Sequence, residues 1–247
     1  MDRFIKSATA ALLLVNTAFF VLLRIAVAVW GDGAQQDEEI VALLGMRLPN
    51  PWPWTPLTYM FTHAQFSLFF FNMVWLICIG RIFEMAGTRR RLWAAYISGG
   101  LFGAGIYAVA WAMGIIPSDI PLLGASAAVV GITTCGAVMA PKASFRLLVL
   151  GDVNLMWIGI ITVILSLFPA LTGEIPSAIS HLGGAIGGAL AGLAMAHGWL
   201  PRFSRRDIKR KADAMTLDEL LDKIRRSGYK SLTKAESARL LELSKKL

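Results

Sequence analysis

Long apolar stretches alternate with short polar or proline-marked breaks along most of this 247-residue chain. An apolar run of about 18 residues or more predicts a transmembrane helix, because ~20 residues rising ~1.5 Å each cross the ~30 Å hydrocarbon core. The pattern predicts six such helices, at residues 8–30, 57–80, 92–116, 121–140, 145–168 and 176–200. We therefore expect an all-α membrane protein with six transmembrane helices.

The charged residues in the breaks predict how the helices are oriented. Basic residues gather at one set of breaks, namely Arg3, Lys6, Arg81, Arg89, Arg90, Arg91, Lys142, Arg146 and the run from Arg202 to Lys211. The alternate breaks hold Arg47 among acidic residues, namely Asp32, Asp37, Glu38, Glu39, Asp119 and Glu174. Loops rich in lysine and arginine stay in the cytoplasm. We therefore expect a multi-pass protein with both termini in the cytoplasm.

The chain becomes polar and charged after about residue 205. Residues 216–219, Thr-Leu-Asp-Glu, have the pattern of a capping box that starts a helix, and residues 233–236 repeat it before a second short helix. We expect two domains: a six-span membrane domain at 1–204 and a soluble cytoplasmic helical hairpin at 205–247.

Composition argues against several classes of function. Hydrophobic residues make up 56% and charged residues 16% of the chain, which excludes an ordinary soluble domain. Cys78 and Cys135 lie in predicted membrane helices without a CxxC pair or a histidine cluster, so no disulfide framework or zinc site is predicted. The basic tail contains no motif for binding nucleic acid, and its positive charge favours contact with anionic lipid. A transporter is disfavoured because the halves do not repeat and the predicted spans hold no carboxylate except Asp152, in the first part of the fifth span.

Two polar residues lie at matching depth in this apolar background. Ser126 and His181 each come about five residues into a predicted helix, after Pro121 and Pro176, and both helices start on the same side of the membrane. A histidine inside a membrane span is costly and indicates a functional site. Because no carboxylate lies at that depth, the pair predicts a dyad in which His181 takes the proton of Ser126 and passes it to a leaving amine.

Small residues surround both positions. Gly124 and Ala127 lie beside the serine, and Gly184 and Gly188 follow the histidine at the spacing that lets two membrane helices approach closely. A Ser–His hydrogen bond of ~3 Å between two helices needs such an approach. The same residues also suit plain helix packing, which stays an open alternative for the serine.

The second predicted helix adds two polar side chains near the same level, His63 and Asn72. An asparagine amide among phenylalanines can donate to a developing oxyanion. It can equally hydrogen-bond a neighbouring helix, and both interpretations stay open.

These features follow one another in a recognisable order. The pieces are Leu57-Thr58-Tyr59-Met60-Phe61-Thr62-His63, Asn72, Gly80-Arg81-Ile82-Phe83-Glu84, Gly124-Ala125-Ser126, and His181 with Gly184 and Gly188. Over residues about 50–200 this series resembles the rhomboid family of intramembrane serine proteases. The paired tail helices are similar to a small C-terminal domain of some bacterial rhomboids.

The resemblance implies a six-transmembrane-helix rhomboid-like bundle in a bacterial inner membrane, with a water-accessible cavity that opens outward. Ser126 would then be the nucleophile and His181 the base, and the substrates would be transmembrane segments of other membrane proteins. Gly184 and Gly188 would support the helix packing. A dyad of this kind needs no cofactor.

The resemblance also implies supporting groups around the serine. The Ser126 backbone amide and Asn72 would stabilise the oxyanion, and Gly124 and Ala127, on either side of the serine motif, would belong to the same stabilising region. Residues 169–176 would form a movable cap over the cavity.

The chain departs from the family pattern at several positions. Ala127 stands for a glycine and would place a methyl group beside the oxyanion amide, Leu68 stands for a histidine donor, and Val130 stands for an aromatic residue that stacks on the histidine. Thr55 stands for an arginine, which would leave Glu84 without its expected partner. Loss of one oxyanion donor costs ~3 kcal/mol. The alternative function is therefore a catalytically inactive rhomboid-like protein that binds membrane-protein clients.

Overall fold

A computed structural model gives the structure of this protein at residues 7–31, 34–86, 89–117, 120–147, 151–199, 215–229, 232 and 234–244. The chain divides into two units, Met1–Trp199 and Leu200–Leu247.

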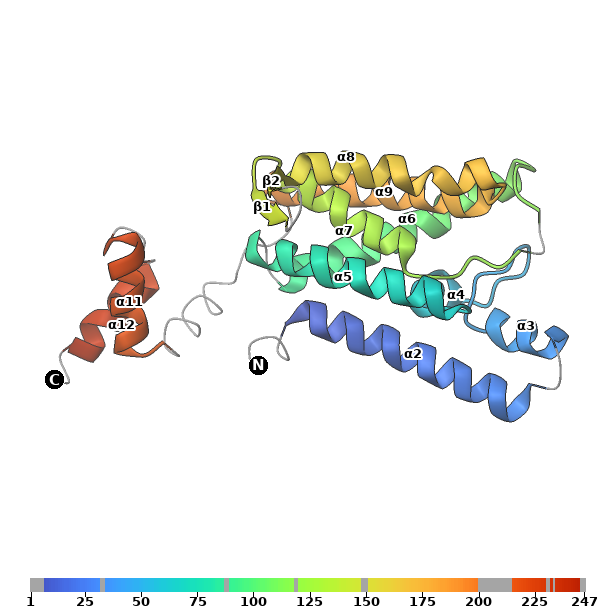
Figure 1. Cartoon of the computed structure of the whole chain (residues 1–247), viewed down its shortest axis with the longest axis horizontal. Coiled ribbons are helices and arrows are strands. Elements are labelled where there is room, and N and C mark those ends of the chain that lie inside the picture. The colour runs from blue at the N-terminus through green and yellow to red at the C-terminus, as the bar shows by residue number, and fades with distance from the viewer. Residues whose placement is uncertain are drawn as a thin grey trace. The chain divides into compact units, whose positions relative to one another are not determined.

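The first unit consists mainly of helices (Figure 1). Its elements are α2 (Ala8–Trp30), α3 (Ala34–Ala42), α4 (Thr55–Thr58), η1 (Tyr59–Phe61), α5 (Phe66–Ala86), α6 (Arg89–Ala112), α7 (Ser126–Met139), β1 (Ser144–Leu147), β2 (Gly151–Asn154), α8 (Leu155–Ser166), η2 (Phe168–Thr172) and α9 (Ile175–Ala196). Among the described residues, five spans are long and apolar enough to cross a membrane, in α2, α5, α6, α8 with η2, and α9, while α7 is a shorter apolar helix. The expected helical membrane bundle is confirmed.

Consecutive membrane helices run in alternating directions, so that α5, α7 and α9 begin at the end of the bundle where α2, α6 and α8 finish (Figure 1). We call the end at which α7 begins with Ser126 the serine face. The segment between α2 and α5, with α3 and α4, lies at this face.

The first predicted helix has the same bounds as α2, but the second was placed too early. Residues 57–65 do not belong to the membrane helix, which begins at Phe66. They form the short turns of α4 and η1, in which Tyr59, Met60 and Phe61 are buried in the protein. The run is apolar because it packs inside the domain, and hydropathy alone does not distinguish this burial from contact with lipid.

The fourth and fifth predicted helices also begin later than expected. Gly124 has a φ of +101°, which L-residues rarely adopt, and the helix starts only at Ser126. Residues 145–147 and 151–154 do not belong to a helix either, because β1 and β2 pair antiparallel with Ser144 opposite Asn154. The membrane helix α8 therefore begins at Leu155.

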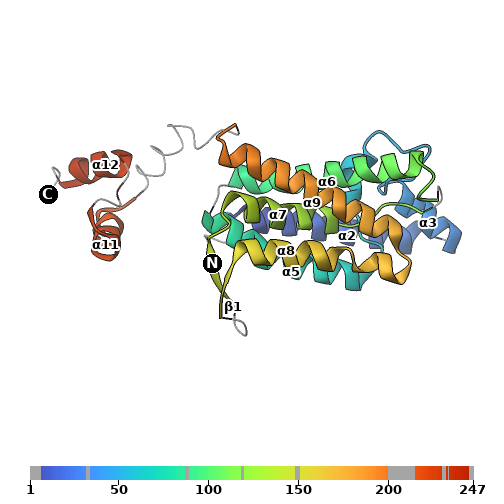
Figure 2. The same ribbon diagram turned by 90° about the horizontal axis from the view of Figure 1, so that it is seen from above.

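The short helix α7 occupies the centre of the bundle, in contact with α5, α6, α8 and α9 (Figures 1 and 2). Its central residues are buried. On the α6 side, a Cβ on Gly99 would lie 2.8 Å from the Cα of Gly131, so the two backbones meet without side chains between them. This contact between backbones holds α7 close against α6.

Glu84 has partners other than the arginine that the family pattern suggested. Its carboxylate accepts a hydrogen bond from the Thr9 hydroxyl at 2.9 Å and another from the Ala8 backbone N–H, at the first turn of α2. Thr55 precedes α5, whereas Glu84 lies near the other end of that helix. The expectation that Thr55 deprives Glu84 of its partner was wrong, because the two positions lie at opposite faces.

The second unit contains α11 (Leu217–Ser227) and α12 (Lys234–Ser244). The capping box predicted at residues 216–219 is confirmed, with Thr216 and Glu219 each accepting from the other's backbone N–H. Lys223 donates to both carboxylate oxygens of Glu236 at 2.8 Å and so joins the two helices. The second predicted box depends on Thr233, which lies outside the described residues.

Candidate functional site

Helices α7 and α9 run in the same direction and touch along a row of glycines. A Cβ on Gly184 would overlap the carbonyl group of Ala127, and one on Gly188 would overlap the carbonyl oxygen of Gly131. One turn further, a Cβ on Gly192 would lie 2.7 Å from the Cys135 carbonyl oxygen. Because contacts recur every four residues on both helices, one face of α9 lies directly on one face of α7.

This register determines the level of the two candidate catalytic residues. Ser126 directly precedes Ala127, and His181 lies one turn before Gly184, toward the serine face. Both residues therefore lie at the same end of the α7–α9 contact. Ser126 was expected about five residues into a helix, but it is the first residue of α7.

Its position at a helix start gives Ser126 a particular electrostatic setting. The first helical hydrogen bond here runs from the Val129 N–H to the Ala125 carbonyl oxygen at 2.9 Å. Within the described part of the chain, the N–H groups of Ser126, Ala127 and Ala128 have no hydrogen-bond acceptor. Free N–H groups and the positive end of the helix dipole make such a site favourable for an anion.

The loop before the serine is held by hydrogen bonds to the segment that precedes α5. Gly124 donates its N–H to the Tyr59 carbonyl oxygen at 3.0 Å. Ala125 donates its N–H to Nε2 of His63 at 3.2 Å. Nδ1 of His63 lies 3.3 Å from the Phe61 carbonyl oxygen, which can only accept, so His63 is neutral with its proton on Nδ1.

His63 lies outside the membrane helices, between η1 and α5, and it is 1% exposed. Burial lowers the pKa of His63 to about 4, which keeps the ring neutral near pH 7. The sequence suggested a polar group near the level of the serine, but not that this ring would hold the serine's own loop.

His181 is 8% exposed and is fixed by a group that sequence analysis missed. Its Nδ1 donates to the Ser166 carbonyl oxygen, at the end of α8, at 2.7 Å. This bond fixes the tautomer in which Nε2 carries no proton and can accept one. A backbone carbonyl leaves no mark in a sequence, so this third partner could only be found in the folded chain.

The structure does not join the two candidate catalytic residues directly. Among the described residues, no hydrogen bond links the Ser126 hydroxyl with His181. The hydroxyl nearest to Nε2 of His181 in hydrogen-bonding geometry is that of Ser177, at 3.5 Å and one turn earlier on α9. Ser126 is half-buried, whereas His181 is buried.

Asn72 is half-buried on α5, and within the described part of the chain its amide has no hydrogen-bond partner. Leu68, one turn earlier, is 57% exposed and has no polar group to donate. Val130 is buried one turn after the serine. The amide of Asn72 is therefore free to serve a ligand, whereas Leu68 is not able to replace a histidine donor.

The methyl group of Ala127 is accommodated by α6. A Cβ placed on Gly103 would lie 2.8 Å from the Ala127 Cβ, so α6 provides a glycine at the point where this methyl group packs. Ala127 is 1% exposed. The extra methyl group expected beside the oxyanion amide thus fills a helix interface.

The expected cap at residues 169–176 corresponds to η2 and the start of α9. Gly173, with a φ of +88°, separates the two elements. Leu171 is 82% exposed. Because η2 follows Ser166 closely, any movement of this segment acts near the carbonyl group that holds His181.

Within the described ranges, no group of three His, Cys, Asp or Glu side chains could hold a metal ion. Cys135 lies against Met195, with sulfur atoms 3.7 Å apart, and Cys78 is exposed on α5.

Comparison with known proteins gives two family matches. Residues 51–198 match the model of the Rhomboid domain, and these residues make up more than half of the chain. Residues 205–246 match the model of a family of unknown function (DUF6576). A search of curated proteins finds no match.

Proposed function

This chain belongs to the rhomboid family, and on that premise we propose that it is an intramembrane serine endopeptidase with a Ser126–His181 dyad. Its substrates are transmembrane segments of other membrane proteins. The observation that supports the proposal is the register between α7 and α9, in which Ala127 lies against Gly184. Because of this register, Ser126 and His181 lie at the same end of the contact between the two helices.

The reaction follows from the protonation state of the pair. His181 Nε2 accepts the hydroxyl proton of Ser126 as Oγ attacks the scissile carbonyl carbon, which gives a tetrahedral oxyanion. The imidazolium then gives that proton to the leaving amine as the C–N bond breaks. Water, deprotonated by the same nitrogen, hydrolyses the acyl-enzyme and regenerates Ser126. The Ser166 carbonyl oxygen keeps the Nδ1 proton in place throughout.

We expect the oxyanion to be stabilised by backbone N–H groups at the start of α7 and by the side chain of Asn72. The N–H groups of Ser126 and Ala127 at the start of α7 have no other acceptor among the described residues, and the Asn72 amide adds a side-chain donor. Because Leu68 contributes none, we expect turnover slower by about 10²–10³ than with a full set of donors.

We place the serine face outside the cell, in a bacterial inner membrane, with both termini in the cytoplasm. The basic residues Arg81, Arg89 and Arg90 support this orientation, because α5 ends and α6 begins at the other end of the bundle from Ser126 (Figure 1). We also propose the division into a membrane domain at 1–204 and a soluble helical domain at 205–247, in keeping with the two family matches.

The test uses the purified full chain in liposomes with a panel of single-span substrates. We expect the wild type to cleave, and Ser126→Ala and His181→Ala each to lose cleavage while thermal unfolding stays unchanged. Ser177→Ala identifies which serine attacks, since its hydroxyl lies 3.5 Å from Nε2, and it should keep cleavage. Ser244→Ala, an exposed serine of α12, serves as the matched control.

A second function has specific support: a client-binding protein without catalysis. Leu68 offers no donor, and no hydrogen bond joins Ser126 to His181 within the described residues. If the folded wild type cleaves nothing while an active rhomboid cleaves the same panel, the protease proposal fails. Capture of uncut single-span proteins, equal for wild type and Ser126→Ala, would then support client binding.

A further inference from the structure

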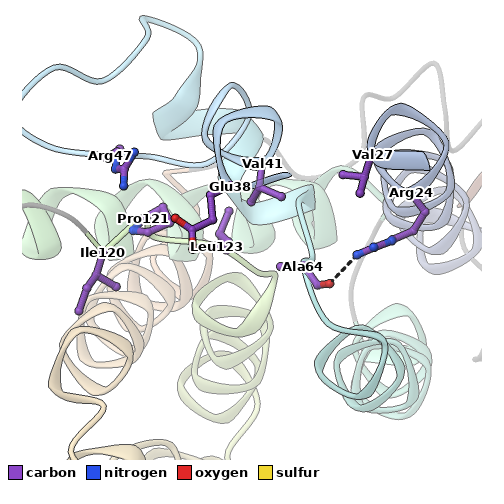
Figure 3. Close-up of a pocket in the computed structure, with 9 residues that line it drawn as sticks. All are labelled: Arg24, Val27, Glu38, Val41, Arg47, Ala64, Ile120, Pro121 and Leu123. Carbon is purple, nitrogen blue, oxygen red and sulfur yellow. Dashed lines mark hydrogen bonds between the residues drawn. The ribbon is translucent and has the colours of Figure 1, made fainter. Parts of the chain in front are cut away.

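A cavity of about 560 Å³ opens at the serine face, apart from the Ser126–His181 pair (Figure 3). Its wall comes from α2, α3, the segment after α3, the residue after His63 and the strand-like segment before Gly124. The lining residues are Arg24, Val27, Glu38, Val41, Arg47, Ala64, Ile120, Pro121 and Leu123. This volume falls in the range of ~300–1,000 Å³ that is typical of small-molecule sites.

Arg24 is an unusual residue for this position, because it belongs to a membrane helix. It lies six residues before Trp30, the last residue of α2, or ~9 Å along the helix axis. Trp30, Trp52 and Trp54 are 67%, 51% and 46% exposed near the same face, and exposed tryptophans are typical of the headgroup region. Arg24 therefore lies close enough to this level for its long side chain to reach phospholipid headgroups.

The guanidinium of Arg24 has donors left for a ligand. Nη1 donates to the Ala64 carbonyl oxygen at 2.9 Å (Figure 3). That carbonyl is its one partner among the described residues, whereas a guanidinium carries five N–H groups in a planar fork that suits phosphate.

The opposite wall supplies a carboxylate and apolar surface. Glu38 reaches into the same space from α3 and is exposed, without an ion pair to Arg24 (Figure 3). Val27, Val41 and Leu123 add apolar walls. Arg47 also lines this wall. Cationic, anionic and apolar side chains in one cavity complement a ligand that carries a phosphate, an ammonium group and an apolar end.

We propose that this cavity binds the headgroup of phosphatidylethanolamine from the leaflet at the serine face. The phosphate accepts from Arg24, the ammonium donates to Glu38, and the glycerol end of the lipid lies against the valines. Access from lipid is available because α2 is mostly exposed, with only 17% of its apolar window buried.

A lipid in this cavity contacts both the loop that precedes Ser126 and the segment that holds this loop by hydrogen bonds. Ala64 directly follows His63, and Leu123 directly precedes Gly124. Since His63 accepts from the Ala125 N–H, a bound headgroup stabilises the contact between these segments from the outside.

The test measures lipid retention by the delipidated full chain, by native mass spectrometry, with phosphatidylethanolamine, phosphatidylcholine or phosphatidylglycerol of matched acyl chains. We expect the wild type to prefer phosphatidylethanolamine over phosphatidylcholine by about tenfold, since the choline group offers no N–H to Glu38. Glu38→Gln should lose that preference. Arg24→Gln should weaken the binding of all three lipids by about tenfold, and Arg24→Lys should bind them with an affinity between those of the wild type and Arg24→Gln.

Arg90→Gln, an equal change of charge at the opposite face, is the matched control and should change nothing. Equal retention of the ethanolamine and choline lipids by the wild type would overturn the proposal, as would an unchanged preference in Glu38→Gln. So would displacement of the lipid by inorganic phosphate at equal concentration, which would indicate a free-anion site. No substrate is present, so the outcome does not depend on the proposed protease activity.

Discussion

His63 and Ser166 act at the scale of single residues: His63 holds the residue beside Ser126, and Ser166 holds His181, each by one hydrogen bond. The His63 ring accepts the N–H of Ala125, and the Ser166 carbonyl oxygen accepts the Nδ1 proton of His181. Neither group reacts itself. Both restrict the orientation of residues that would react, which is how a dyad can work without a carboxylate partner.

His63→Ala is expected to lower stability by about 1–3 kcal/mol, because the buried Ala125 N–H loses its acceptor. Thermal unfolding in detergent micelles measures this loss. His63→Gln, which keeps an acceptor, should recover part of it. An unfolding temperature unchanged in His63→Ala would show that the hydrogen bond contributes nothing.

The same residue predicts a dependence on pH. Burial depresses the pKa of His63 from 6.5 to about 4, so the unfolded chain binds the extra proton between these values. The stabilisation is present above pH 6.5 and is lost as the pH falls toward 4. Unfolding temperatures measured across this window should fall more steeply for the wild type than for His63→Gln, and parallel curves would contradict the assignment.

At the scale of elements, two features position the candidate site: the late start of α7 and its contact with α9. Because α7 begins at Ser126, the serine lies at a helix N-terminus with free N–H groups instead of inside a helix. The glycines of α9 then bring the backbone of α9 against α7, so the distance between Ser126 and His181 depends on the absence of a few methyl groups.

Gly184→Ala is expected to push α9 away from α7, because the new Cβ overlaps the Ala127 carbonyl group. Overpacking of this kind costs about 1–3 kcal/mol, and we expect cleavage to fall along with the unfolding temperature. Gly105→Ala is the matched control on α6, since its Cβ would meet nothing within 4 Å. Equal behaviour of the two variants would contradict the backbone contact as the cause.

At the scale of the whole molecule, the two ends of the bundle differ in charge and in chemistry. The candidate catalytic residues, the cavity with Arg24 and the exposed Trp30, Trp52 and Trp54 belong to the serine face. The first turn of α2, and the basic residues where α5 ends and α6 begins, belong to the other face (Figure 1). We therefore expect substrates to be cut near the external surface of the membrane.

Cysteine labelling in intact cells tests this orientation. In a chain without Cys78 and Cys135, Leu171→Cys should react with a membrane-impermeant maleimide, because Leu171 is 82% exposed at the serine face. Ser244→Cys in α12 should react only after the cells are permeabilised. The reverse pattern would place the serine face in the cytoplasm.

Much of the fold could be predicted because burial in lipid demands long apolar helices. The bounds of α2 and the capping box at Thr216 followed from local pattern alone. The starts of α5, α7 and α8 were placed too early, since apolar residues also fill the turns around Tyr59 and the hairpin that ends at Asn154. A pattern that records only polarity does not distinguish these environments.

For the site, the sequence by itself determined which residue types are available: a serine and a histidine at similar depth, small residues beside them, and the family to which they belong. Only the tertiary structure decided that Ser126 begins a helix, that the Ser166 carbonyl oxygen fixes His181, and that Gly103 accommodates the methyl group of Ala127. Those facts depend on backbone atoms and on the register between helices. Neither is encoded by the polarity of individual side chains, because each arises where segments distant in the chain meet.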